Sequence, residues 1–234
     1  MFGNLDFDEL SLKLAPSLAK ILLKSAGDTF DYDQLSALVA SIDSALFASE
    51  YLMNVPRFNS DDALLRDSVV SARKGGLFLE FGVATGRTLR IIAETYPGKV
   101  YGFDSFNGLP ENWREGYAAG AFAQQPPETL PNAELVIGLF DQTLPSFIVR
   151  NREPISFIHI DCDLYSSTVT ILETLKNNII PGTIIVFDEY LNYPGWRHHE
   201  YRAWTEFVKK YNVSFKYTGV VPIHQQLRVE ILGI

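Results

Sequence analysis

Residues 77–88, LFLEFGVATGRT, decide the fold of this chain. An apolar run ends at Glu80 and Phe81, and small residues with two glycines, Gly82 and Gly86, follow before a helical pattern begins. In an open α/β sheet, a ligand binds where a strand passes into the next helix. Glycines there allow a positive φ or a close approach of the backbone, and the helix N-terminus adds partial positive charge. The segment therefore predicts a strand, a ligand-binding turn and a helix.

The pattern around this segment predicts a Rossmann-like α/β fold. Short apolar runs alternate with amphipathic segments, which is typical of a mostly parallel, doubly wound sheet with helices on both faces. The predicted strands are 77–81, 100–103, 135–137, 155–160 and 183–187, and the last two runs, 214–221 and 226–234, predict a closing antiparallel pair. The predicted helices are 8–25, 33–53, 61–76, 86–96, 143–150, 164–178 and 198–211.

This order of helices and strands predicts that the chain has two parts. Residues 1–60 are predicted to form an N-terminal helical extension, and residues 61–234 the ligand-binding domain. The segment 107–133 is rich in Pro and Gly and too long for a plain connection, so we expect a lid or binding loop there.

Composition excludes several classes of protein. With 20 Lys and Arg against 28 Asp and Glu, the net charge is -8, which opposes binding to a nucleic acid backbone. No apolar run approaches the ~20 residues that cross a bilayer, so no membrane partner is expected. Cys162 is the only cysteine, which excludes an internal disulfide and fits a cytoplasmic protein.

The glycine turn favours one kind of ligand over two others. A dinucleotide turn needs a glycine where Ala84 stands, and Glu80 would lie close to a pyrophosphate. A phosphate loop needs Lys before Ser or Thr, whereas Arg87 and Thr88 follow Gly86 after too short a gap. A cationic ligand suits the turn better, because a carboxylate can accept hydrogen bonds from an ammonium group. A tight turn capped by this carboxylate is the structural alternative.

Two further strand ends point to an adenosine-containing ligand. Asp104, followed by Ser105, ends the next apolar run about twenty residues later, where nucleoside-binding folds place the acid that holds a ribose. Gly138, Phe140 and Asp141 follow the third run, where an adenine ring would stack. Each acid has an alternative role as a turn or helix cap.

The chain resembles the macrocin O-methyltransferase family of class I S-adenosylmethionine-dependent methyltransferases. The likeness covers residues 60–232 and rests on LEFGVATGRT, VYGFDSFNGLPE, GLFDQTLP, HIDCDLYSST and VFDEY, in that order. It implies a seven-stranded sheet, S-adenosylmethionine as methyl donor, magnesium dependence and a homo-oligomer formed through N-terminal helices. The expected cofactor contacts are Glu80, Phe81, Gly82, Gly86, Thr88, Asp104, Ser105, Gly138, Phe140, Asp141 and Asp161.

Acidic side chains follow the last two strands of the parallel set. Asp161 and Asp163 end one run, and Asp188 and Glu189 end the next. If these strands are neighbours, the acids converge, which is costly unless a cation is shared; an all-oxygen set favours Mg²⁺. The resemblance supports Asp161, Asp188 and Glu189 as ligands, although the family usually has Asp at the last position. The alternative is that Asp163 caps a helix and that no metal binds.

The resemblance and the acids together predict the reaction. We expect a Mg²⁺-assisted methyl transfer to a hydroxyl of a sugar-bearing or polyhydroxylated small molecule. Leu164 replaces the lysine that similar catechol methyltransferases use, so the candidate catalytic residues are Asp161, Asp163, His198 and His199. The rival hypotheses are a nucleotide-sugar or dinucleotide-dependent oxidoreductase and a non-catalytic cofactor-binding domain.

Overall fold

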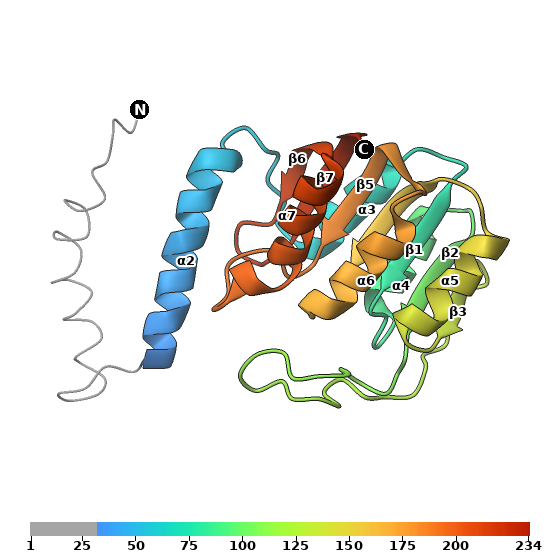
Figure 1. Cartoon of the computed structure of the whole chain (residues 1–234), viewed down its shortest axis with the longest axis horizontal. Coiled ribbons are helices and arrows are strands. Elements are labelled where there is room, and N and C mark those ends of the chain that lie inside the picture. The colour runs from blue at the N-terminus through green and yellow to red at the C-terminus, as the bar shows by residue number, and fades with distance from the viewer. Residues whose placement is uncertain (1–31) are drawn as a thin grey trace, which may run out of the picture.

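The computed structural model describes residues 32–234. These residues form a seven-stranded sheet with the order β3-β2-β1-β4-β5-β7-β6 (Figure 1). The strands are β1 Leu77–Phe81, β2 Val100–Asp104, β3 Ala133–Ile137, β4 Ile155–Ile160, β5 Ile179–Phe187, β6 Ser214–Val220 and β7 Leu227–Gly233. Strands β1 to β5 pair in parallel, and β7 is antiparallel to both β5 and β6. The predicted doubly wound sheet with an antiparallel end is confirmed.

Helices cover both faces of the sheet (Figure 1). They are α2 Tyr32–Tyr51, α3 Asp61–Ser71, α4 Arg87–Thr95, α5 Phe140–Arg150, α6 Tyr165–Leu175, η1 Trp196–His198 and α7 Glu200–Tyr211. Strand pleating divides the core: Phe78 and Phe157 pack with α3 and α4, whereas Leu79 and Ile158 pack with α5, α6 and α7. The two apolar layers bury the central strands completely.

The boundaries differ from the sequence prediction mainly at irregular positions. Helix α5 begins at Phe140 rather than at residue 143, with Asp141 in its first turn, where a carboxylate favours the helix dipole. Strand β5 begins at Ile179 and includes Gly182 at φ 90°, which obscured its start in the sequence. Residues 105–132 contain no helix or strand, as expected for a long loop.

Helix α2 packs at one end of the sheet, beside β6 and α7 (Figure 1). Phe47 anchors it with edge contacts to Trp196, Tyr201 and Tyr217, with ring centroids 5.6 to 5.8 Å apart. The other predicted N-terminal helix, 8–25, lies outside the described residues, so the division at residue 60 stays a prediction. No helix within residues 32–234 is long and apolar enough to span a bilayer.

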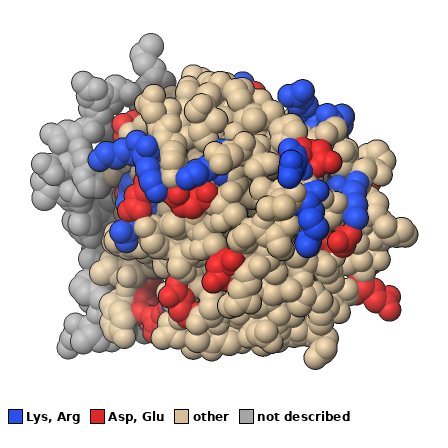
Figure 2. All heavy atoms as spheres, turned by 45° about the vertical axis from the view of Figure 1, so that its right-hand side comes forward, with Lys and Arg blue, Asp and Glu red and all other residues tan. Residues whose placement is uncertain are grey.

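On the surface that Figure 2 shows, Lys and Arg lie beside acidic residues in the upper and middle parts, and only acidic residues are visible near the bottom. Several charged residues form exposed ion pairs, such as Arg202 with Glu206 and Lys210 with Glu173. Such exposed pairs contribute less than about 1 kcal/mol each to stability. The fold therefore depends on its two apolar layers rather than on surface charge.

Candidate functional site

The glycine turn after β1 is clamped between its neighbouring strands. Gly82 donates its N–H to the Phe103 carbonyl (2.9 Å), and the Asp161 N–H donates to the Phe81 carbonyl (2.8 Å). Gly82 has φ 92°, and a Cβ there would lie 1.6 Å from the Asp161 carbonyl oxygen. Glycine is therefore required by the contact between the ends of β1 and β4, whether or not a ligand binds.

Asp104 holds the same turn from the end of β2. Its Oδ2 accepts hydrogen bonds from the N–H groups of Val83 and Ala84, both at 2.9 Å, and its Oδ1 accepts from Phe106 N–H at 2.8 Å. The carboxylate thus performs the turn-capping role that was the structural alternative for it. It also lines the cavity described next, and these three bonds leave about one of its four acceptor positions for another partner.

A cavity of about 490 Å³ opens at the carboxyl ends of the parallel strands. Its predicted site residues are Gly82, Asp104, Ser105, Gly138, Phe140, Asp141, Asp161, Asp163 and Glu189. This volume falls within the usual range for a small-molecule or cofactor site, and the site lies where an open α/β sheet binds its ligand. The cavity therefore fits a nucleoside cofactor with space beside the acids.

Carboxylates dominate one side of this cavity: Asp163 is buried, and Asp161 and Glu189 are half-buried. Burial and the Asp188 carboxylate raise the pKa values of Asp161 and Glu189 well above their ordinary values. Burial also raises the pKa of Asp163 to about 7, although Arg114 opposes this shift. Strand ends that bring these acids together leave an excess of negative charge, which a cation would relieve.

Two carboxylates and one imidazole lie close enough to surround a divalent cation, and the predicted ligand Glu189 is not part of this group. One ligand atom from each of His159, Asp161 and Asp188 lies within 4.8 Å of the others. Asp188 Oδ1 and Glu189 Oε2 are buried and have no hydrogen-bond partner within the described chain. Carboxylate oxygens without a hydrogen-bond partner are the kind of ligand that Mg²⁺ prefers.

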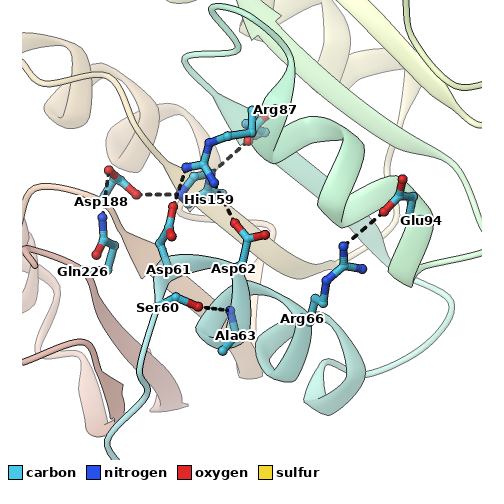
Figure 3. Close-up of polar contacts among 11 residues, drawn as sticks. Ser60, Asp61, Asp62, Ala63, Arg66, Arg87, Glu94, His159, Asp188 and Gln226 are labelled. Atoms are coloured by element: carbon cyan, nitrogen blue, oxygen red, sulfur yellow. Dashed lines mark hydrogen bonds and ion pairs between the residues drawn. The ribbon is translucent and has the colours of Figure 1, made fainter.

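The structure places Glu80 outside the cavity lining, below the strand ends. Its carboxylate is fully buried on the face that α3 and α4 cover, and its Oε1 lies 2.9 Å from His159 Nδ1. His159 Nε2 lies 3.4 Å from Asp188 Oδ1, and Figure 3 shows Asp188 between His159 and Gln226. Burial disfavours the charged ring, but contacts with Asp188 and Glu80 outweigh it and raise the pKa of His159 well above its ordinary value.

Six other predicted residues also lie outside the cavity lining, and one of them is Asp188, although its neighbour Glu189 lines the cavity. Phe81 is buried in the core, Thr88 is buried in α4, and Gly86 packs against Pro127 of the long loop. His198 is exposed, and His199 stacks on Tyr193 with ring centroids 6.0 Å apart. Asp163 is therefore better placed than either histidine to meet a substrate.

The cavity contains residues that sequence reasoning missed. Ser166, Ser167 and Thr170 of α6 line it, although nothing in their pattern distinguishes them from ordinary helix residues. Arg114 is the only cation among the described lining residues, and its guanidinium lies 3.9 Å from the Trp113 ring centroid and 4.7 Å from that of Tyr193. The aromatic residues around Arg114 in the sequence were the available signal.

We expect Asp163→Asn to stabilise the metal-free protein at high pH. The native pKa of Asp163, about 7, exceeds the unfolded value, so its contribution to stability is present at low pH and is lost as pH rises through 7. Asparagine removes the charge and tolerates the φ of 64° at this position. The free energy of unfolding in chelator should increase by roughly 1–3 kcal/mol at pH 8 and by about a third as much at pH 5, as measured by urea titration.

Asp141→Asn is the matched control for this measurement, because Asp141 is exposed at the same cavity. It should change the free energy of unfolding by less than about 0.5 kcal/mol at either pH. If Asp163→Asn is no more stable than the wild type at pH 8, the carboxylate is not destabilised in the native state.

Comparisons with known proteins agree with this geometry. Residues 79–190 match a family described as a methyltransferase domain. The calicheamicin methyltransferase CalS11 has 20% identity and a TM-score of 0.59, over 98% of this chain and 94% of that chain. The O-methyltransferase NovP has 20% identity and a TM-score of 0.57, over 73% and 79%. MycE, a methyltransferase of the mycinamycin pathway in complex with Mg and SAH, has 14% identity and a TM-score of 0.50, over 80% and 53%.

No curated protein matches the chain in sequence. Residues 79–190 therefore carry a methyltransferase domain, and the fold supports a class I S-adenosylmethionine-dependent methyltransferase. The narrower resemblance to the macrocin O-methyltransferases stays a prediction.

Proposed function

We propose that this protein transfers the methyl group of S-adenosylmethionine to a hydroxyl oxygen of a small molecule, with Mg²⁺ held by Asp161, Asp188 and Glu189. The observation that carries this proposal is that the Gly82 turn, Asp104 and three acids, Asp161, Asp163 and Glu189, line one cavity, with Asp188 close to Asp161. A bound Mg²⁺ would lower the pKa of an acceptor hydroxyl and orient its oxygen.

The residues of this chain have separate roles in the proposal. Asp104 and Phe140 hold the nucleoside half of the donor, by hydrogen bonding to the ribose and by stacking on the adenine. Asp163 accepts the proton of the acceptor hydroxyl, because its carboxyl lines the cavity and its pKa of about 7 suits proton transfer near neutral pH. The long loop closes over the cavity with Trp113 and Tyr117, which excludes water.

The same cavity suggests the class of acceptor. Trp113, Tyr117 and Phe122 give it flat apolar walls, and Arg114 presents a guanidinium that lies against the Trp113 ring and favours the charged form of Asp163. A sugar that stacks on aromatic rings and carries an anionic group would satisfy both features. CalS11 is a TDP-rhamnose 3'-O-methyltransferase, and we propose a sugar-bearing or polyhydroxylated acceptor here as well.

The test of the proposed function is release of S-adenosylhomocysteine in the presence of candidate acceptors. A nucleoside-diphosphate deoxysugar, a neutral glycoside and a simple catechol should be compared, each with Mg²⁺ and with a chelator. Turnover that requires both an acceptor and the metal supports the proposal. Undiminished turnover in chelator would remove the metal, and binding of NAD in preference to S-adenosylmethionine would support the oxidoreductase alternative.

We also propose that two copies of the chain associate through α2. Its outer side exposes Tyr32, Leu35, Val39, Ile42 and Leu46, which repeat at intervals of three and four residues. This is the spacing of a helix-pairing seam, and an apolar stripe of this kind is typical of an interface. A homo-oligomer is therefore proposed, while the cytoplasmic location expected from the sequence stays a prediction.

We expect the double substitution Val39→Glu with Leu46→Glu to convert the oligomer into monomers. Two carboxylates in the centre of the seam would have to be desolvated without partners. Size-exclusion chromatography with light scattering measures the mass directly. Ser41→Glu adds a charge to an exposed position of α2 away from the stripe and should leave the mass unchanged. A wild-type chain that is monomeric at high concentration would contradict this proposal.

A further inference from the structure

Glu80 and His159 form a buried polar pair in an otherwise apolar layer. They are partners in the register between β1 and β4, and neither side chain is exposed. Phe78 and Phe157 precede them on the same face, and Leu64 and Val186 belong to the same cluster. A buried ion pair is often no more stabilising than apolar residues of the same volume. Stability alone therefore does not explain why this pair occupies the core.

His159 connects Glu80 to Asp188. Its Nδ1 lies 2.9 Å from Glu80 Oε1, which fixes the plane of the ring. Its Nε2 points to Asp188 Oδ1 at 3.4 Å, too long for a well-formed hydrogen bond, and both atoms are buried. The other oxygen, Asp188 Oδ2, accepts a hydrogen bond from Gln226 Nε2 at 3.2 Å (Figure 3). Asp188 is thus held from two sides, by the β4 histidine and by Gln226.

We propose that His159, anchored by Glu80, is a positioning residue that orients the Asp188 carboxylate for a divalent cation. This inference rests on the metal site of the proposed function. Polar partners of metal ligands fix the orientation of those ligands, and their loss typically weakens metal affinity 10- to 100-fold. Glu80 then acts through His159 and Asp188 rather than by contact with the methyl donor. Glu80, two residues before Gly82 of the glycine turn, is thus connected through His159 to Asp188, the proposed metal ligand.

Substitution of His159 by asparagine or by glutamine tests the contacts of its two ring nitrogens separately. Asparagine places an NH₂ group near the position of Nδ1, so His159→Asn keeps the contact with Glu80 and loses the contact with Asp188. Glutamine reaches the position of Nε2, so His159→Gln keeps a donor for Asp188. A purely structural role would make both variants similar, whereas a positioning role makes glutamine the better replacement.

The measured quantity is the Mn²⁺ dissociation constant of the full-length protein saturated with S-adenosylhomocysteine. Electron paramagnetic resonance detects the free and the bound Mn²⁺. His159→Asn should raise the Mn²⁺ dissociation constant about 10- to 100-fold, and His159→Gln should raise it clearly less. Glu80→Gln should shift the constant in the same direction and serves as the second variant if His159→Asn does not fold. Thr183→Val is the control, because Thr183 is buried in β5 and donates to the Ile155 carbonyl, away from Asp188. It should lower the melting temperature without changing Mn²⁺ affinity.

Three results would overturn the inference. Wild-type affinity in His159→Asn would show that the ring does not orient Asp188. Nitrogen modulation from a directly bound imidazole in the wild-type Mn²⁺ spectrum would make His159 a ligand instead of a positioning residue. Absence of Mn²⁺ binding by the wild type would refute the proposed metal site as well. If the wild type binds Mn²⁺ and the asparagine variant does so equally, only this inference fails.

Discussion

Asp161→Asn is expected to lower kcat for methyl transfer by roughly a thousandfold, equivalent to ~4 kcal/mol of transition-state stabilisation. Asp161 lies at the end of β4 between the glycine turn and Asp188, and its carboxylate lines the cavity. Asparagine keeps the shape of the side chain but removes the charge that the proposed metal site needs. Because burial and Asp188 raise the pKa of Asp161 well above its ordinary value, the metal-free protein should not lose stability.

Rapid-quench measurement of kcat and calorimetric titration of S-adenosylhomocysteine separate the two functions of the site. The cofactor affinity of Asp161→Asn should change far less than kcat. Glu111→Gln is the control, since Glu111 is an exposed carboxylate that accepts a hydrogen bond from Ser166 near the cavity. It should retain near wild-type turnover. A rate for Asp161→Asn within tenfold of the wild type would exclude Asp161 from the reacting site.

Gly82→Ala is expected to prevent folding or to lower the free energy of unfolding by at least about 4 kcal/mol. The new Cβ would lie 1.6 Å from the Asp161 carbonyl oxygen and 2.6 Å from its carbonyl carbon, and φ is 92°. Neither atom can move without separating β1 from β4. Urea unfolding measures the loss.

Gly75→Ala isolates the backbone contribution to this effect. Gly75 has φ 89°, but no heavy atom lies within 4 Å of a Cβ built there. Its alanine variant should lose only about 1–2 kcal/mol, which is the cost of a left-handed conformation. Similar losses for the two variants would show that the contact between the two strand ends is not tight.

The sheet could be predicted from the sequence because its signals are local. Apolar runs of strand length alternate with amphipathic segments, and the order of these runs limits the connections that a right-handed crossover permits. The start of β5 was missed because Pro181 and Gly182 interrupt its pattern. Such residues weaken a strand signal, and in the structure the register of β5 with β4 shifts across them before pairing resumes at Ile184.

The site could be predicted only in part, because strand ends mark a region and not the direction of each side chain. The sequence prediction treated Glu80 as a donor contact, but pleating places it on the same face as Phe78, where His159 is its partner. His159 itself was missed, because one histidine within an apolar strand resembles a core residue. Arg114 comes from the long loop, whose conformation depends on tertiary contacts that no local pattern specifies.

The central claim is that the acidic strand ends surround the methyl donor and a divalent cation in one cavity. A crystal structure of the full-length protein soaked with S-adenosylhomocysteine and Mn²⁺, with anomalous data for manganese, tests this most directly. The account predicts the ribose at Asp104, the adenine beside Phe140 and an anomalous peak between Asp161, Asp188 and Glu189. Cofactor density elsewhere, or a fully occupied cofactor with no peak at these carboxylates, would contradict it.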